Sequence, residues 1–180
     1  MGAPSFALFD TPLGPCALVW GENGLVGAYL PEADPAKTRA RICRRFPDAV
    51  EADPPRRVAE AIAAIGRLMR GEAEDFASVT LDMAAVPEFN RRVFALAQTI
   101  PPGETLTYGQ VADRIGEPGQ AQAVGQALGA NPFPIIVPCH RVVAAGGKLH
   151  GFSAPGGLET KRKLLALEGS SLKGASLFGG

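Results

Sequence analysis

Residues 131–143 read Asn-Pro-Phe-Pro-Ile-Ile-Val-Pro-Cys-His-Arg-Val-Val. The apolar run 135–137 is typical of a short buried strand, and Pro138 indicates a break just before Cys139. A thiol is a strong nucleophile only as the thiolate, so a nearby imidazole that accepts its proton raises its reactivity. Neighbouring side chains of an extended segment point to opposite faces, so we expect Cys139 and His140 to cooperate where the chain turns, or through water. The pair is a candidate nucleophile and base, and a buried structural cysteine is the alternative.

The composition is that of a globular protein. The chain has 180 residues, of which 46% are hydrophobic, enough for one good core or two small ones. No apolar run approaches the roughly 20 residues of a membrane helix, and the first residues lack the basic and apolar regions of a signal peptide. Cys16, Cys43 and Cys139 lie far apart without the paired spacing of a zinc site. We therefore expect a soluble cytoplasmic protein with reduced thiols, no metal and no membrane partner.

The zero net charge hides an asymmetry between the two halves. Residues 1–84 contain nine Lys or Arg and twelve Asp or Glu, whereas residues 85–180 contain nine and six. The modest positive balance of the second half suits a polyanion such as nucleic acid, but it is equally typical of an ordinary solvated surface. Charge alone makes nucleic acid one of several possible partners.

The first 84 residues have the pattern of a small α+β domain. Asn23-Gly24 predicts a tight hairpin with positive φ angles. Before and after it, short apolar runs predict a three-stranded meander, and 3.6-residue periodicity predicts two amphipathic helices, followed by one further strand. These elements are expected at residues 6–9, 16–20, 25–30, 34–46, 53–70 and 78–81. Their apolar faces are most simply core, so this domain is expected to act as a scaffold.

The second half, residues 85–180, reads as a mostly helical domain after a linker at 84–87. A helix is expected over 88–99, and Thr107 is placed to cap another that runs to about residue 115. A turn and a short helix at 120–129 complete a helix-turn-helix pattern. Small residues in that last helix let its backbone lie against a nucleic acid groove or pack tightly on another helix. These residues are Ala121, Ala123, Gly125 and Ala127.

The stretch 131–143 resembles the active-site signature of the O6-alkylguanine-DNA alkyltransferase family. The resemblance runs from 89–93 through 102–112 to 161–169 and covers about residues 87–169. It implies an α+β protein with a small ribonuclease H-like N-terminal domain and a winged-helix-like C-terminal domain. It also implies DNA repair by direct reversal, in which one alkyl group passes irreversibly from O6-alkylguanine to the protein. The implied partner of the monomeric protein is double-stranded DNA containing alkylated guanine, and no cofactor is implied.

The resemblance also implies roles for individual residues. Cys139 would attack the alkyl carbon after the nucleotide has flipped out of the stack, with His140 acting as base through water. Glu168 would orient the imidazole. Tyr108 would donate a proton or hydrogen bond near N3 of the leaving guanine, and Asn131 would hold the cysteine loop.

Two further sets of residues follow from the resemblance. The expected substrate contacts are Val143, Phe152, Ser153, Gly156, Gly157 and Lys161. The expected DNA contacts are Thr107, Gln122, Ala123, Gly125, Gln126 and Arg141. The chain departs from the family at Gln122, where an Arg usually replaces the flipped nucleotide, which puts activity or substrate preference in doubt. It also departs at a longer loop near Ser153, and a reshaped pocket would admit larger alkyl groups or O4-alkylthymine.

Two other functions fit parts of the sequence. Alkyltransferase-like proteins share the architecture and recognise lesions, but they lack the acceptor cysteine, so the presence of Cys139 speaks against that class. A Cys-His hydrolase would turn over and require an oxyanion hole, for which no motif is visible.

Overall fold

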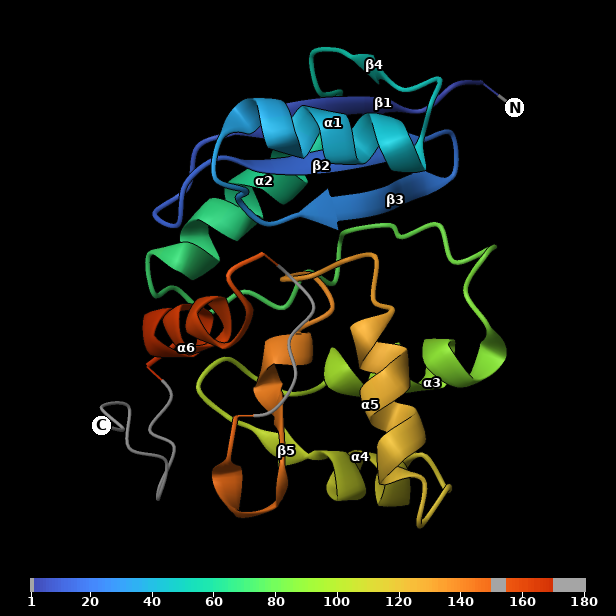
Figure 1. Ribbon diagram of the computed structural model, residues 1–180, viewed down its shortest axis with the longest axis vertical. Coiled ribbons are helices and arrows are strands. Elements are labelled where there is room, and N and C mark those ends of the chain that lie inside the picture. The colour runs from blue at the N-terminus through green and yellow to red at the C-terminus, as the bar shows by residue number, and fades with distance from the viewer. Residues whose placement is uncertain (1, 150–154, 170–180) are drawn as a thin grey trace.

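The computed structural model describes residues 2–149 and 155–169 and has a mixed α/β fold, with a four-stranded sheet beside a group of short helices (Figure 1). The sheet order is β3-β2-β1-β4, and the predicted meander is confirmed by the antiparallel pairing of its first three strands. A short fourth strand, which was not predicted, pairs parallel to β1. The strands are β1 (Ser5–Phe9), β2 (Cys16–Gly21), β3 (Gly24–Tyr29) and β4 (Val50–Glu51).

The hairpin between β2 and β3 differs from its prediction. Gly21 pairs with Gly24, and of the predicted Asn23-Gly24 dipeptide only Gly24 has a positive φ, at 136°. A Cβ atom on Gly24 would lie 2.6 Å from the carbonyl oxygen of Thr80. Glycine is therefore required here for a close approach of two backbones as well as for the turn.

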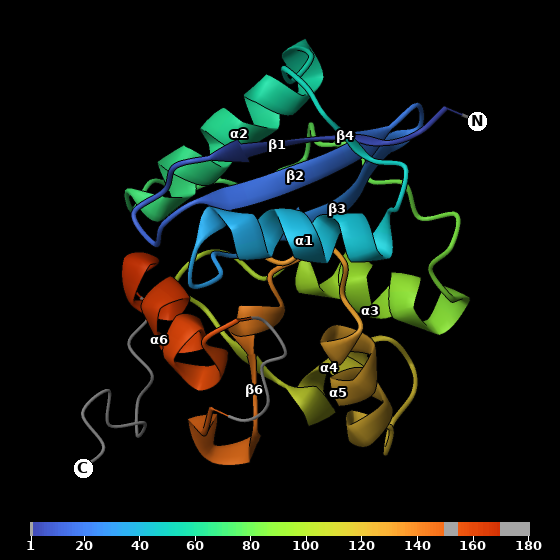
Figure 2. The same ribbon diagram turned by 45° about the horizontal axis from the view of Figure 1, so that its top comes forward.

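Two amphipathic helices cover opposite faces of the sheet (Figure 2). Helix α1 (Pro35–Arg45) begins after Asp34, whose carboxylate accepts a hydrogen bond from the Lys37 amide at 3.0 Å. Its Ile42 is buried against one face of the sheet. Helix α2 (Arg56–Met69) packs on the other face and starts later than expected, because residues that precede a proline avoid the helical region.

The strand expected at residues 78–81 is absent from the described chain. Leu81 instead forms one isolated bridge with Leu25, between hydrogen bonds from Leu25 N to Thr80 O and from Asp82 N to Leu25 O. This bridge brings the segment against β3, the edge strand of the sheet. A single bridge is too short to count as a strand.

The second half contains the helices that were expected and several short elements around them. Thr107 forms a full capping box with Gln110 at the start of α4, as predicted for this residue. A turn over residues 115–120 then joins α4 to α5. The elements are α3 (Glu88–Ala97), β5 (Leu106–Thr107), α4 (Tyr108–Arg114), α5 (Ala121–Gly129), the 3₁₀ helix η1 (Cys139–Arg141), β6 (Val142–Val143), the 3₁₀ helix η2 (Ala145–Gly147) and α6 (Gly157–Leu167).

One continuous hydrophobic cluster runs through both halves of the chain. It joins Trp20 and Leu68 of the sheet layer to Phe94, Val124 and Phe133 of the helical layer. The backbone also crosses between the layers, because the Ala28 amide donates a hydrogen bond of 2.8 Å to Pro132 O. The sheet therefore helps to position the segment that leads to Cys139. Within the described residues, no helix is long and apolar enough to cross a bilayer.

Candidate active site

The segment before Cys139 is a turn. The apolar run 135–137 is buried as expected, but the predicted strand is wrong, because Ile135 has a φ of 80° and residues 134 and 137 form an isolated bridge. A β-branched residue in the left-handed region costs about 1–3 kcal/mol and persists only where its surroundings fix it. Asn131 supplies part of that support. Its side chain accepts a hydrogen bond from Phe133 N at 2.9 Å and donates one to Val137 O at 3.0 Å.

Cys139, His140 and Arg141 form the 3₁₀ turn η1, so the cysteine and histidine do not lie on opposite faces of a strand. The Arg141 amide donates to Pro138 O at 2.9 Å, which closes the turn. Cys139 is 8% exposed and His140 is fully buried. The thiol is therefore close to the surface, while the imidazole behind it is shielded from solvent.

Glu168 lies at the end of α6 and binds the His140 ring. Its Oε1 is 2.7 Å from His140 Nε2, and an ionised carboxylate can only accept, so Nε2 carries the proton. The other ring nitrogen, Nδ1, is buried and has no hydrogen-bond partner among the described residues. The neutral imidazole therefore offers the lone pair of Nδ1 as a proton acceptor.

Arg141 completes this buried group. It donates to Glu168 Oε1 at 2.7 Å, to Glu168 Oε2 at 3.0 Å and to Ile100 O at 2.6 Å. Arg141 is 3% exposed and its guanidinium is used in these internal contacts, so its expected contact with DNA stays a prediction that this burial does not support. Arginine fits here because its planar fork matches both carboxylate oxygens.

The surroundings shift the pKa values of Cys139, His140 and Glu168. Burial alone would raise the pKa of Glu168, but hydrogen bonds from His140 and Arg141 lower it to about 2. Burial lowers the pKa of His140 against the opposing effect of Glu168, which keeps the ring neutral. Burial raises the pKa of the Cys139 thiol, while a hydrogen bond from Asn131 and the charge of Lys161 oppose this rise. The thiol therefore needs a base to become a thiolate.

Lys161 and Tyr108 lie near the thiol. Lys161 projects inward from α6, is 1% exposed, and donates to Val142 O at 2.8 Å. Its Nζ lies 5.9 Å from the centroid of the Tyr108 ring. Burial lowers the pKa of Lys161 to about 8, against the opposing charge of Cys139. Burial, and then the charge of Cys139, raises the pKa of Tyr108, which keeps its hydroxyl protonated as a donor.

The predicted DNA contacts on α5 occupy two environments. Gln122 and Gln126 are exposed, whereas Ala123 and Gly125 are half-buried. A Cβ on Gly125 would lie 3.9 Å from the Tyr108 ring, so this glycine packs beside the candidate proton donor. The small residues of α5 therefore serve internal packing at least in part.

The predicted substrate contacts are only partly placed. Val143 is buried and pairs with Thr107 through β5 and β6. Gly156 caps the start of α6 with a φ of 82°, and Gly157 is the first residue of that helix. Phe152 and Ser153 lie outside the described residues. The described part of the chain contains no cluster of three or more His, Cys, Asp or Glu side chains that could hold a metal ion.

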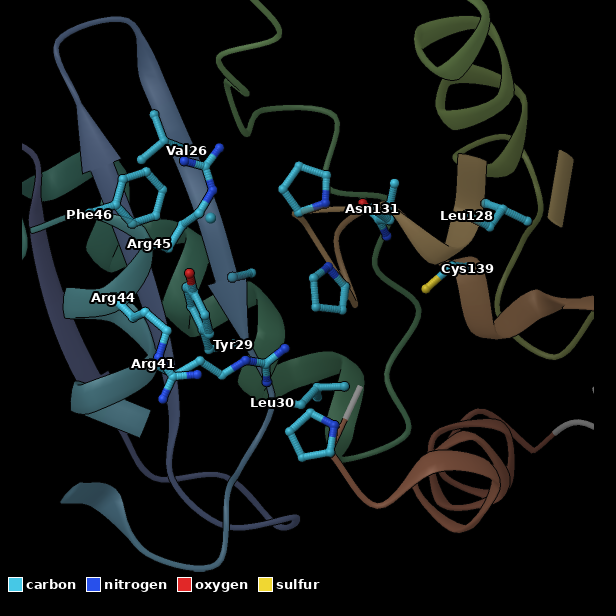
Figure 3. A pocket seen from close by; sticks show the side chains of 16 residues that line it. Val26, Tyr29, Leu30, Arg41, Arg44, Arg45, Phe46, Leu128, Asn131 and Cys139 are labelled. Atoms are coloured by element: carbon cyan, nitrogen blue, oxygen red, sulfur yellow. The ribbon is translucent and has the colours of Figure 1, made fainter. Parts of the chain in front are cut away.

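A cavity of about 430 Å³ opens beside Cys139 (Figure 3). One wall comes from the helical half and includes Leu128, Asn131 and Pro134 beside the cysteine. The opposite wall comes from β3 and α1. It includes Tyr29, Arg41, Arg44, Arg45 and Phe46. This wall was not predictable from the sequence, because no motif links these arginines to a residue about a hundred positions away; the scaffold role of the N-terminal half stays a prediction.

Comparison with known proteins agrees with this geometry. Residues 88–170 match the family model described as "6-O-methylguanine DNA methyltransferase, DNA binding domain". The methylated-DNA–protein-cysteine methyltransferase of Mycobacterium tuberculosis is 40% identical over 167 residues, which are 92% of each chain. The protein of that name from Mycolicibacterium paratuberculosis is 51% identical over 114 residues, 63% of this chain and 67% of the relative. The crystal structure of Mycobacterium tuberculosis OGT in complex with DNA is 35% identical, covers 97% of this chain and 99% of that one, and has a TM-score of 0.74.

Proposed function

The chain belongs to the family of methylated-DNA–protein-cysteine methyltransferases, and from this premise we propose that Cys139 is the residue that accepts the alkyl group. The protein repairs alkylated DNA by direct reversal, and DNA is its partner. One observation supports the role of Cys139 above the others. The buried His140 is held by Glu168 at one nitrogen, and its other nitrogen, Nδ1, has no hydrogen-bond partner within residues 2–149 and 155–169.

In the proposed reaction, the Cys139 proton passes to His140 Nδ1 through a water molecule. The thiolate attacks the alkyl carbon, a bond forms between Sγ and that carbon, and the bond from carbon to guanine O6 breaks. The electron pair leaves with guanine, and the Tyr108 hydroxyl supplies a proton or hydrogen bond near N3. The thioether has no low-energy return path, so each molecule acts once.

Arg141 and Glu168 act as positioning residues in this proposal. The two guanidinium contacts hold the carboxylate in the ionised form, and the carboxylate fixes the tautomer and direction of the imidazole. Lys161 provides a buried positive charge that favours the thiolate. Its proposed place is therefore beside the thiolate, in addition to the expected contact with substrate.

The proposed DNA contact uses α5. Because Cys139 is nearly buried, the damaged nucleotide must rotate out of the duplex, and unstacking costs a few kcal/mol. The exposed Gln122 and Gln126 are the α5 side chains best placed to touch DNA. We keep the ribonuclease H-like and winged-helix-like descriptions of residues 1–84 and 85–180 as part of the proposal, supported by the mixed sheet and by the parallel pairing of β5 and β6. A monomer in the cytoplasm, where thiols stay reduced, completes it.

A methyl-transfer experiment tests this proposal. Incubation with an oligonucleotide that contains O6-methylguanine should add one methyl mass to the peptide with Cys139. The peptides with Cys16 and Cys43 serve as internal controls, because Cys16 has a pKa raised to about 11 by burial and Cys43 lies on the outer side of α1. Lesion binding with an unmodified Cys139 peptide would indicate a lesion-recognition protein instead.

A further inference from the structure

The cavity beside Cys139 is larger than a methyl group requires, and its far wall is cationic. A methyl group on guanine O6 would occupy only the part next to the sulfur, which points into the cavity (Figure 3). Beyond that part the cavity extends to the last turns of α1. The residues there include Arg41, Arg44 and Arg45.

The two walls are held at a fixed separation. β3 is the edge strand of the sheet, and its Ala28 amide donates to Pro132 O on the segment that carries Asn131. Helix α1 is fixed on one face of the same sheet through Ile42, which is completely buried. The cavity is therefore part of the folded structure, because backbone hydrogen bonds and core packing both fix its shape.

The charge of the far wall is only partly compensated. Arg41 forms an ion pair with Glu32 at 3.2 Å, but neither Arg44 nor Arg45 takes part in an ion pair within the described residues. No Asp or Glu is among the described residues that line the cavity. The guanidinium of Arg45 lies 5.1 Å from the Phe46 ring centroid, and that of Arg41 lies 5.5 Å from the Tyr29 ring centroid. Aromatic contacts of this kind limit the freedom of the cations.

Apolar side chains also line the cavity. Pro134 and Pro155 are among them, and because neither is fully buried, both offer hydrocarbon surface to a chain that crosses the cavity. From this arrangement we infer that the protein also accepts O6-alkyl groups longer than methyl that end in a carboxylate, with Arg44 and Arg45 as the binding groups for that carboxylate. This inference rests on the proposed function.

The chemical step is the same as for methyl. The thiolate of Cys139 attacks the first carbon of the alkyl chain, the bond from that carbon to O6 breaks, and guanine leaves with the electron pair. The terminal carboxylate takes no part in bond making. It binds the arginines before and during the attack, and it remains on the resulting thioether.

Three oligonucleotides of one sequence test the inference. They contain O6-methylguanine, O6-(3-carboxypropyl)guanine or O6-(3-carbamoylpropyl)guanine, of which the last two have the same size and differ in charge. The wild-type protein should transfer the 3-carboxypropyl group about fivefold faster than the 3-carbamoylpropyl group. This ratio is what one partly exposed ion pair contributes. In Arg44→Gln/Arg45→Gln the ratio of these two rates should fall to about one.

The control is Lys37→Gln/Arg39→Gln, which removes the same charge from α1 at positions that do not line the cavity. It should keep the wild-type ratio. Equal rates for the two long groups in the wild type, or an unchanged ratio in the Arg44/Arg45 variant, would overturn the inference. An equal loss of transfer rate for all three oligonucleotides in the Arg44/Arg45 variant would mean that the arginines bind the DNA backbone. This result would also overturn the inference. Failure of the wild type to transfer methyl would reject the proposed function itself.

Discussion

Glu168 links the chemistry of the site to its stability. Replacement by Gln keeps the shape but removes the charge that fixes the His140 tautomer, so transfer from O6-methylguanine should slow about 100-fold, within the range of acid-base contributions. Single-turnover transfer rates measure this. Glu159→Gln, at an exposed position on the same helix, is the control and should keep the wild-type rate. A normal rate in the Glu168 variant would show that His140 needs no carboxylate.

The same carboxylate gives a pH dependence with a defined sign. Its folded pKa of about 2 lies below the ordinary value of 4.5, so its contribution to stability is complete above 4.5 and is lost as the pH falls from 4.5 towards 2. The unfolding free energy measured in urea should therefore drop more steeply for the wild type than for Glu168→Gln in this window. If the unfolding free energies of the two proteins fall in parallel with pH, the pKa of the Glu168 carboxylate is not lowered by His140 and Arg141.

At the scale of elements, α5 carries Gln122, where the sequence is expected to depart from the family. Gln122 is exposed on this helix, so Arg at this position would meet no steric obstacle and would add a planar cation that stacks and reaches phosphates. Gln122→Arg should tighten binding to lesion DNA or speed methyl transfer by about tenfold, equal to 1–2 kcal/mol. Binding titrations and single-turnover rates measure the two effects.

Gln122→Lys is the matched control for charge. Both variants should bind DNA with a steeper salt dependence, because each adds one cation near the phosphates. Only Arg should speed transfer, since Lys lacks the flat surface that can replace a flipped base. If neither variant differs from the wild type, another residue performs the task expected of an Arg at this position.

Elements that depend on local signals were predictable from the sequence. Asp34 and Thr107 mark helix starts through hydrogen bonds to backbone amides three residues ahead, and both helices begin where these residues indicate. The run 135–137 was misread as a strand, because burial of an apolar run does not distinguish a strand from a turn. Ile135, with its positive φ, lies between Phe133 and Val137, whose backbones are both hydrogen-bonded to the Asn131 side chain, and no local pattern specifies this support.

At the scale of the whole molecule, Gly24 joins the sheet to the chain that leads into the helical half. An Ala there would need a φ of 136° and would place its Cβ 2.6 Å from Thr80 O. Gly24→Ala should therefore lower the unfolding free energy by about 2 kcal/mol through backbone strain. Gly21→Ala is the control, because its Cβ would meet only Val26 at 3.9 Å, and its effect should stay within about 0.5 kcal/mol. Equal stability of the two variants would show that the backbone at residue 80 moves away without cost.

The site was predictable only where a motif runs along the chain. The resemblance at 131–143 led to Cys139 and His140, and it also indicated Glu168, which the structure brings within 2.7 Å of the imidazole. The inward direction of Arg141 was not predictable, because a sequence gives the charge of a side chain and not the direction in which the fold turns it. The cationic wall of the cavity was missed for a similar reason, since α1 reaches Cys139 only through the folding of the sheet.

The two walls of the cavity come from different halves of the chain. Substitutions on one wall can therefore have different consequences from substitutions on the other. The wall with Cys139 belongs to a buried hydrogen-bonded group whose members tolerate little replacement, because each loss leaves a polar partner unpaired. On the other wall, Arg44 and Arg45 are exposed, and their side chains make no hydrogen bond or ion pair within the described residues. Natural variation and laboratory selection can therefore act on α1 to change which lesions are repaired. The residues proposed to carry out the transfer stay unchanged.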